Sequence, residues 1–312
     1  MPIDSRIVII RSGALGDLLQ LVPFMRAHKS IFPKKHITLA CGISSLEAIK
    51  HSPYIDDIIT FNDNIIYNGS YLSKISETIK LIFKLRKFDK CYVMHIDKRW
   101  QILPVFAGVQ DIIKLTLIKN CSLIDGMLEC LPSATKHNKR YEFHPNKIKI
   151  TIPEQPYIAL ATGGGRNSQN DSACKRWTGY TKLINEIIDK TDFNIVLLGL
   201  DEDNIDIKHK RITNLCGMTT LSDAYHLIDA AELFVGNDSG LLHLACCTKT
   251  KKVGIFTSTD PNRILGNIAD VIPITSTLPC SPCEKNGKFR SDCNNECVDS
   301  ISVKSVLEFI KK

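Results

Sequence analysis

The sequence lacks any long hydrophobic run. No apolar segment among its 312 residues approaches the roughly 18 residues that a membrane-spanning helix needs. The start of the chain also lacks the apolar region of a signal peptide, because only four apolar residues separate Arg6 from Arg11. We therefore expect a soluble globular protein in the cytoplasm. With 44% hydrophobic and 23% charged residues, the chain has enough length for two domains of roughly 150 residues each.

Acidic residues are scarce in the first half of the chain. Residues 1–150 hold 22 Lys and Arg against 13 Asp and Glu, an excess of nine positive charges. Residues 151–312 hold 18 against 20, an excess of two negative charges. A basic face suits a polyanionic partner such as nucleic acid, a phosphorylated glycolipid or an acidic membrane surface. A Lys-rich surface that is merely solvated explains the same composition.

Short β-branched runs alternate with segments of helical spacing throughout the chain, which predicts an α/β protein with parallel sheets. A polar, Pro-containing stretch at 142–156 separates two such series, so we expect one domain at 1–150 and a second at 151–312. The predicted strands lie at 7–10, 36–41, 55–61 and 90–96 in the first series, and at 157–161, 194–199, the short apolar run that ends at Gly236, and 253–256 in the second.

An amphipathic helix is predicted from about Tyr71 to Phe88. Apolar side chains from Leu72 to Phe83 share one side, and Lys80, Lys84 and Lys87 form a basic stripe on another. Such a stripe could contact a membrane surface or an anionic acceptor, although exposed faces of ordinary helices are commonly rich in lysine.

Three glycine turns follow predicted strands. Gly13 and Gly16 precede Asp17, which either caps the next helix or faces an open crevice. The run 162–166 contains three glycines and is followed by Lys175, a combination of backbone donors and a cation that suits a phosphate. In the third turn, Gly236–Gly240, the first N–H groups of the next helix favour an anion. An ordinary helix cap or a flexible loop explains each turn alone.

Cysteines are numerous, and four of the twelve are clustered near the end of the chain. Their spacing, Cys280-x2-Cys283-x9-Cys293-x3-Cys297, suits a four-thiolate structural site for Zn²⁺ or iron. Free or redox-paired thiols are the alternative. The remaining eight lie among apolar segments, where cysteine acts as a small hydrophobic residue: Cys41, Cys91, Cys121, Cys130, Cys174, Cys216, Cys246 and Cys247.

Seven motifs in order resemble those of the glycosyltransferase family 9 heptosyltransferases, and they span nearly the whole chain. They are Arg11–Asp17, Lys175–Trp177, Leu197–Gly199, Cys216–Leu221, Gly236–Gly240 with His243, Phe256–Pro261 and Cys280–Cys283. The resemblance implies a GT-B architecture of two Rossmann-like domains facing a central cleft. The first would bind the acceptor and the second the nucleotide-sugar, with a C-terminal helix at 303–312 packing back toward the first domain.

The family's chemistry implies inverting transfer of a heptose or related sugar from an ADP-sugar to a hydroxyl of a surface glycan such as the lipopolysaccharide inner core. Asp17 would act as the base, and Lys175 with the N–H groups of Ser239 and Gly240 would stabilise the leaving diphosphate without a metal cofactor. The other implied donor contacts are Thr162, Gly163, Glu202, Thr219, Asp238 and His243.

The implied partners are a nucleotide-sugar donor, an anionic glycan or glycolipid acceptor and the inner-membrane face, with no nucleic acid. Three alternatives stay open at this point. A GT-B epimerase or hydrolase would share the nucleotide site but needs another acid/base pair. A heptosyltransferase that modifies protein side chains would also suit a basic acceptor domain. A non-catalytic nucleotide- or glycan-binding protein would survive the loss of Asp17.

Overall fold

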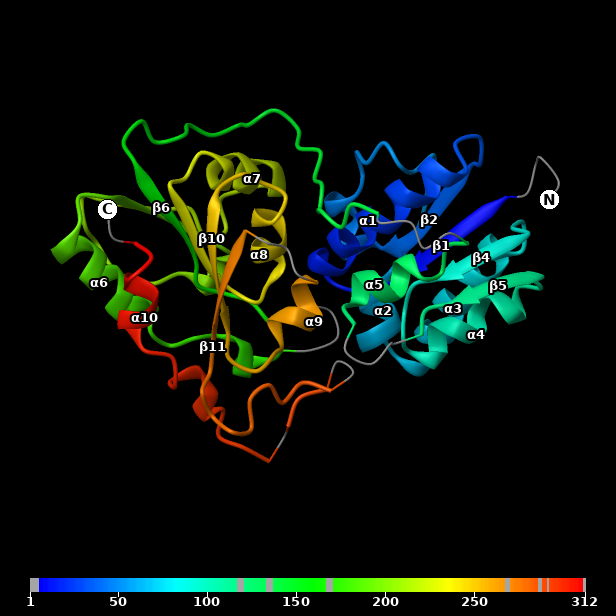
Figure 1. The fold of residues 1–312 in the computed structure, drawn as a ribbon. Helices are drawn as coiled ribbons and strands as arrows, with labels where there is room; N and C mark the ends of the chain where they lie inside the picture. The colour runs from blue at the N-terminus through cyan, green and yellow to red at the C-terminus, as the bar shows by residue number, and fades with distance from the viewer. Residues whose placement is uncertain are drawn as a thin grey trace. The chain divides into compact units, whose positions relative to one another are not determined.

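The computed structural model describes residues 6–116, 121–132, 137–166, 171–266, 270–285, 288–290 and 292–310. The chain forms two compact units (Figure 1). The first comprises residues 1–144 with 167–169 and 262–266, and the second comprises 145–166, 170–261 and 267–312. Each unit is built around its own parallel sheet, as the alternation of apolar strands and helical segments predicts.

The sheet of the first unit has five parallel strands in the order β3-β2-β1-β4-β5. Their bounds are β1 Ile7–Arg11, β2 Ile37–Gly42, β3 Asp57–Phe61, β4 Lys90–Val93 and β5 Asp111–Lys114. Every residue of β1 and β2 is buried, because helices cover both faces of the sheet. Chain order reverses beside β1, whose neighbours are β2 and β4. The carboxyl ends of β1 and β4 therefore form a topological switch point, where doubly wound sheets bind ligands.

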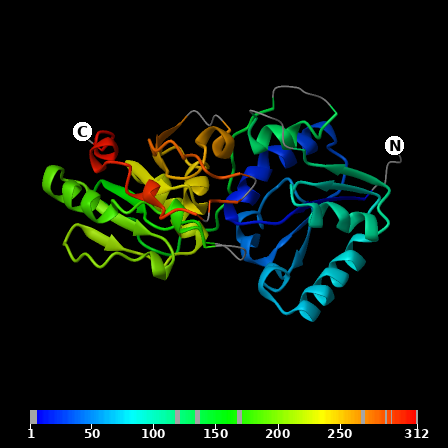
Figure 2. The same ribbon diagram turned by 90° about the horizontal axis from the view of Figure 1, so that it is seen from below.

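Helices cover both faces of this sheet. On one face, rings of α1 contact Tyr92 of β4, and α1 packs against α5. On the other face, α3 and α4 pack over Val8, Ile10 and Val93. Figure 2 shows α3 in cyan along the outer side of this unit. The helices of the unit, with one 3₁₀ helix, are α1 Leu15–Ile31, η1 Ile43–Ala48, α2 Asp63–Asn68, α3 Tyr71–Leu85, α4 Lys98–Phe106 and α5 Leu123–Leu128.

The sheet of the second unit has six parallel strands in the order β11-β10-β9-β6-β7-β8. Their bounds are β6 Tyr157–Ala161, β7 Asn194–Leu198, β8 Ile212–Asn214, β9 Leu233–Asn237, β10 Lys251–Phe256 and β11 Val271–Thr275. Ile158 of β6 pairs with Leu233 of β9, and the order reverses between these two strands. Their carboxyl ends carry the second and third glycine turns, so the fold brings both turns to one switch point.

Helices also cover both faces of the second sheet. Leu183 and Ile187 of α6 pack into one core cluster, and the Tyr157 hydroxyl donates to the carbonyl of Leu227 in α7 on the other face. The helices of this unit are α6 Tyr180–Lys190, α7 Leu221–Asp229, α8 Gly240–Ala245 and α10 Val303–Leu307, with 3₁₀ turns η2 Ala173–Lys175, η3 Asp201–Asp203 and η4 Glu296–Val298. The short helix α9 Pro261–Leu265 lies, apart from its first residue, in the segment 262–266 of the first unit. Within the described residues, no helix is both long enough and apolar enough to cross a bilayer.

The C-terminal helix is shorter than the expected 303–312, and residues 311–312 lie outside the described residues. The family resemblance implied that it packs back toward the first domain. Within the second unit, α10 lies against α6, and Val306, Leu307 and Ile310 join the core cluster of the second sheet. The packing toward the first domain stays a prediction.

A fully buried histidine lies between α1 and the first sheet. The ring of His28 contacts the rings of Phe24, Phe32 and Tyr92 at centroid distances of 6.2, 5.1 and 5.4 Å. Neither of its ring nitrogens has a hydrogen-bond partner among the described residues. Burial, with smaller effects of Lys90 and Lys29, lowers the pKa of His28 from 6.5 to about 4. The imidazole is therefore neutral in the folded protein at neutral pH.

This burial predicts a loss of stability in acid. Because the folded pKa of His28 lies below that of the unfolded chain, the unfolded state binds the proton first. The unfolding free energy of the first unit should therefore fall as the pH drops from about 6.5 to about 4, by up to roughly 3 kcal/mol from this residue. Denaturant unfolding at neutral and acid pH should show a smaller fall in His28→Phe than in wild type. The exposed His36→Phe serves as control, and an equal fall in all three proteins would contradict the prediction.

Candidate functional site

The first glycine turn connects β1 to α1 and places Asp17 in the first turn of that helix. One carboxylate oxygen of Asp17 accepts a hydrogen bond from the backbone N–H of Ala14, at 2.8 Å. The other is 2.5 Å from the guanidinium of Arg11, whose side chain is 5% exposed against 35% for Asp17. Arg11 also donates to the carbonyl of Met94 at the end of β4. Asp17 thus caps the first turn of the helix, and about a third of its side chain remains exposed.

A histidine that the sequence analysis missed lies beside this turn. His95 follows β4, and its Nδ1 accepts the backbone N–H of Asp97 at 3.0 Å, so a neutral ring carries its proton on Nε2. Burial, and next the charge of Arg11, lowers the pKa of His95 from 6.5 to about 4. A neutral N–H donor therefore lies at the same switch point as Asp17. Its signal in the sequence was its position at the end of a predicted strand.

The second glycine turn, after β6, leaves no room for side chains. A Cβ on Gly163 would lie 2.0 Å from the Asp203 carboxyl group, and one on Gly164, whose φ is +132°, would lie 2.7 Å from the Cβ of Ser239. The Thr162 hydroxyl donates to the carbonyl of Asp203 at 2.6 Å. The turn is thus held against η3 and against the start of α8, and only glycine allows both approaches.

Buried Asn237 joins the two glycine turns of the second unit. Its Nδ2 donates to the carbonyls of Thr162 and Gly163, both at 2.9 Å. Its Oδ1 accepts the backbone N–H of Trp177 at 3.2 Å. One fully buried amide therefore fixes the glycine run, the end of β9 and the segment that carries Lys175 relative to one another.

A buried carboxylate holds the cation of this site. Asp238 Oδ2 lies 2.7 Å from Lys175 Nζ and accepts a hydrogen bond from the hydroxyl of Thr259 at 2.8 Å. The Nε2 of His243 is 3.9 Å from Asp238 Oδ1. Burial raises the pKa of Asp238, but the opposing charges of Lys175 and His243, with these hydrogen bonds, outweigh it and hold the pKa below its usual value. The structure therefore brings Lys175, Asp238 and His243 together, as the motifs suggested.

The other predicted donor contacts occupy the same edge of the second sheet or the turns near it. Ser239 is the N-cap residue of α8, and Gly240 is the first residue of that helix. Glu202 lies in η3 after β7, where its carboxylate is 3.6 Å from the guanidinium of Arg166. Thr219 directly precedes Thr220, the N-cap residue of α7. Arg166 also forms an ion pair with Asp203, a contact that the sequence analysis did not find.

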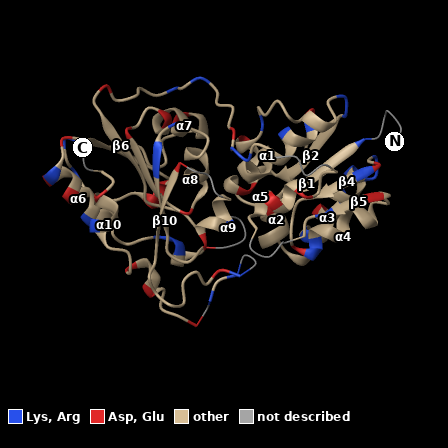
Figure 3. Cartoon of the chain, in the orientation of Figure 1, with Lys and Arg blue, Asp and Glu red and all other residues tan. Residues whose placement is uncertain are grey.

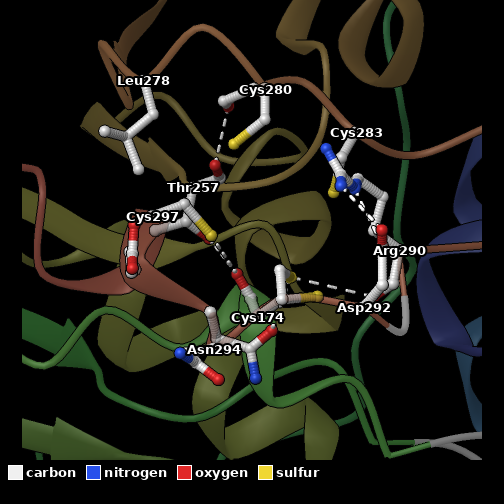
Figure 4. Close-up of a pocket in the computed structure, with 13 residues that line it drawn as sticks. Cys174, Thr257, Leu278, Cys280, Cys283, Arg290, Asp292, Asn294 and Cys297 are labelled. Atoms are coloured by element: carbon white, nitrogen blue, oxygen red, sulfur yellow. Dashed lines mark hydrogen bonds and ion pairs between the residues drawn. The ribbon is translucent and has the colours of Figure 1, made fainter.

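The cysteine cluster lines a cavity of about 240 Å³ in the second unit. Figure 4 shows side chains from the C-terminal loop around this cavity, with Cys174 contributed by η2. The cysteines that line it are Cys174, Cys280, Cys283, Cys293 and Cys297. All five are free thiols. Burial, and then the nearby thiols, raises the pKa of Cys297 to about 11. As the side chains lie, the described residues contain no group of three or more His, Cys, Asp or Glu that could hold a metal ion.

The loop around the cysteine cavity is tied to the segment that carries Lys175. The Thr257 hydroxyl donates to the carbonyl of Cys174, and the carbonyl of Ser258 accepts the backbone N–H of Cys283 at 3.0 Å. The Lys175 ammonium lies 5.7 Å from the centroid of the Phe289 ring. The cysteine cavity therefore lies beside the cation of the candidate site.

Two doubly wound parallel-sheet units with ligand-type turns at their switch points define a GT-B glycosyltransferase fold. The family model described as "Glycosyltransferase family 9 (heptosyltransferase)" matches residues 115–293. The lipooligosaccharide heptosyltransferase 2 of Campylobacter jejuni is 32% identical over 324 residues, covering 96% of each chain. The chain therefore belongs to glycosyltransferase family 9 and is a glycosyltransferase.

Solved structures agree with this fold. The Escherichia coli ADP-heptose lipopolysaccharide heptosyltransferase II superposes with a TM-score of 0.72 at 18% identity, covering 98% of this chain and 97% of that one. TibC, an iron-containing dodecameric glycosyltransferase of enterotoxigenic E. coli, superposes with a TM-score of 0.63 at 17% identity, covering 98% and 78%. The fold class, the family and the enzyme class expected from the sequence are confirmed.

Proposed function

We propose that the protein transfers a heptose from ADP-heptose to a hydroxyl group of the inner core of a lipopolysaccharide or lipooligosaccharide. The observation that carries this proposal is the full-length relationship to the C. jejuni lipooligosaccharide heptosyltransferase 2. The acceptor is an anionic glycolipid, which suits the positive charge of residues 1–150. The enzyme acts in the cytoplasm at the inner-membrane face.

The second unit binds the nucleotide-sugar. The N–H groups of Ser239 and Gly240 and the ammonium of Lys175 stabilise the charge that develops on the departing diphosphate. Asp238 positions Lys175, since their charged groups lie 2.7 Å apart. Thr162, Gly163 and His243 complete the diphosphate and sugar contacts, and Glu202 and Thr219 lie toward the nucleoside.

Calorimetric titration without added metal tests the donor. We expect micromolar affinity for ADP-heptose and at least about tenfold weaker binding of UDP- and GDP-sugars. Lys175→Met should weaken ADP-heptose binding by roughly 10- to 100-fold, because a charge-assisted contact to the diphosphate is lost. The exposed Lys182→Met is the matched control. Preference for a UDP- or GDP-sugar would contradict the proposal that ADP-heptose is the donor. If none of these nucleotide-sugars binds, a non-catalytic role is favoured.

We propose that Asp17 is the general base of the first unit. Inversion requires a group that removes the acceptor proton on the face opposite the leaving ADP, and a carboxylate held in place can do this. Asp17 has the required fixed geometry, because Arg11 and the Ala14 N–H each hold one of its oxygens. Its side chain is accessible enough for an acceptor hydroxyl to reach it.

The variant Asp17→Asn should lower kcat by about 10²- to 10⁴-fold and leave ADP-heptose affinity unchanged, because an amide cannot accept the proton. Asp125→Asn is a matched control, because Asp125 also occupies the third position of a helix and accepts the N-cap backbone N–H. The control separates lost capping from lost catalysis. An Asp17→Asn enzyme within roughly tenfold of wild type would refute the assignment.

We also propose that Cys280, Cys283, Cys293 and Cys297 hold a structural Zn²⁺ or iron ion. Their spacing, their shared cavity and the thiolate donor set favour it, although binding requires the thiols to approach one another. TibC is described as iron-containing. The ion would stabilise the loop that lies beside Lys175 and would take no part in the transfer.

Metal analysis of the purified protein should find about one Zn or Fe ion per chain. Cys283→Ser should lose it and lower the melting temperature, because a ligand is removed. Cys246→Ser is the control, since Cys246 is buried away from this cavity. A metal-free wild-type protein, or a Cys283→Ser variant that keeps its ion, would contradict the proposal and leave free or redox-paired thiols.

A further inference from the structure

The outward face of α3 and the neighbouring face of α4 are apolar. Twelve large apolar residues are exposed within the described parts of the chain, and eight of them lie on these two helices. They are Tyr71, Leu72, Ile75, Ile79 and Phe83 on α3, and Ile102, Val105 and Phe106 on α4. We name these eight residues the α3/α4 apolar surface. Because α3 and α4 pack against each other, the exposed apolar residues gather in one part of the first unit, and such a concentration indicates an interaction site.

The amphipathic helix predicted from the sequence thus has its apolar side largely turned outward. Only Leu81 and Leu85 of α3 are fully buried against the sheet. Tyr71 and Leu72 are 79% and 76% exposed, and Phe83 is 57% exposed. The core of the first unit therefore takes only Leu81 and Leu85 of α3 as buried members, and it leaves the exposed apolar side chains of this helix unpacked.

A groove deepens this surface between the two helices. It encloses about 490 Å³ and is lined mostly by apolar side chains of α2, α3 and α4, including Ile82, Trp100 and Phe106. Lys74 and Arg99 also line it, and the guanidinium of Arg99 forms an ion pair with Asp97 at 2.6 Å. An apolar groove beside cationic groups suits a molecule with a hydrocarbon part and an anionic head, which is the chemistry of an acidic phospholipid.

Basic residues outnumber acidic ones around the α3/α4 apolar surface: residues 71–106 hold eight Lys and Arg against three Asp and Glu. Lys80 and Lys84 lie on α3, Lys87 follows that helix, and all three are exposed. The ammonium of Lys80 lies 3.6 Å from the carboxylate of Glu77, and that of Lys84 donates to the carbonyl of Thr60 at 3.0 Å. Figure 3 shows the Lys and Arg residues of the first unit in blue. The acidic residue of α3, Glu77, is 13% exposed on its side chain and accepts the backbone N–H of Asn62 at 2.9 Å. The surface therefore combines exposed apolar and aromatic side chains with positive charge.

We propose that the α3/α4 apolar surface docks on an anionic lipid bilayer, with its apolar side chains in the interfacial region and its Lys and Arg residues against the lipid phosphates. An interfacial helix has this arrangement of a basic rim beside Leu, Ile and Phe. A bilayer accounts for both features of this surface together, the exposed apolar side chains and the excess of Lys and Arg over Asp and Glu beside them. The inference deepens the proposed function and rests on it, because a glycolipid acceptor lies in such a bilayer.

Sedimentation with vesicles tests this docking on the full-length protein without donor or acceptor. Vesicles of phosphatidylcholine with about 30% phosphatidylglycerol should bind the protein, and pure phosphatidylcholine vesicles should bind it far less. Leu72→Ser with Phe83→Ser should weaken binding by at least about tenfold. Lys80→Glu with Lys87→Glu should weaken it by at least about tenfold, and added salt should weaken wild-type binding.

The matched controls lie in the second unit. Phe309→Ser removes an exposed aromatic residue, and Lys182→Glu with Lys210→Glu reverses two exposed charges, and both should bind vesicles as wild type does. Unchanged melting temperatures and ADP-heptose affinity would show that the α3 variants are folded. Absent vesicle binding, or binding that the α3 variants leave intact, would overturn the proposal.

Light scattering after gel filtration measures the molar mass and tests whether a second copy of the chain binds to this surface instead. Self-association that Leu72→Ser with Phe83→Ser abolishes would assign the surface to a second copy and overturn the proposal. The outcome is separable from that of the proposed function. If the protein prefers ADP-heptose but does not bind vesicles, only the proposal of a docking surface is wrong. If it binds vesicles but not ADP-heptose, only the proposed donor is wrong.

Discussion

The buried amide of Asn237 is the constraint on which the second unit's site depends. Its three hydrogen bonds reach two carbonyls of the glycine turn and the N–H of Trp177, 60 to 75 residues away in the chain. Inside the protein an unpaired amide or carbonyl is costly, so the three segments hold one another in a single arrangement. The backbone donors and the Lys175 segment are therefore preorganised before any ligand binds, which is what electrostatic catalysis requires.

Charge pairing extends this arrangement. Asp238 is buried, and its carboxylate is stable there because Lys175 and Thr259 contact it directly. The same pair places the ammonium beside the loop that contains the cysteines, since the Phe289 ring lies 5.7 Å from Lys175 Nζ. The cysteine loop and the Lys175 ammonium are thus linked through direct contacts. A structural ion in that loop would act on the chemistry only by this indirect route.

Local patterns in the sequence predicted eight of the eleven described strands, the glycine turns and the α/β class, because each depends on residues close together in the chain. The strands β5, β8 and β11 were not predicted. The ion pair of Arg166 with Asp203, and the contacts of Asn237, join distant segments, so spacing alone did not indicate them. The seven ordered motifs predicted the family and its fold, which periodicity alone did not predict. In the second unit of that fold, the second and third glycine turns follow the neighbouring strands β6 and β9. The packing of α10 on α6 follows from this chain's own apolar residues, since Val306, Leu307 and Ile310 join the core of the second sheet.

The amphipathic pattern of α3 shows why periodicity does not settle which side of a helix faces the core. A helix with apolar side chains around more than half its circumference can bury one part and expose another. Here Leu81 and Leu85 meet the sheet, and the row from Tyr71 to Phe83 remains outside. A group of exposed apolar side chains this large lowers the solubility of a protein unless a partner covers it. The surrounding Lys and Arg residues raise the solubility again because they keep the surface charged. An enzyme whose acceptor is anchored in a bilayer has a physical reason to keep such a surface, because two-dimensional encounter at the membrane replaces a slower search through solution.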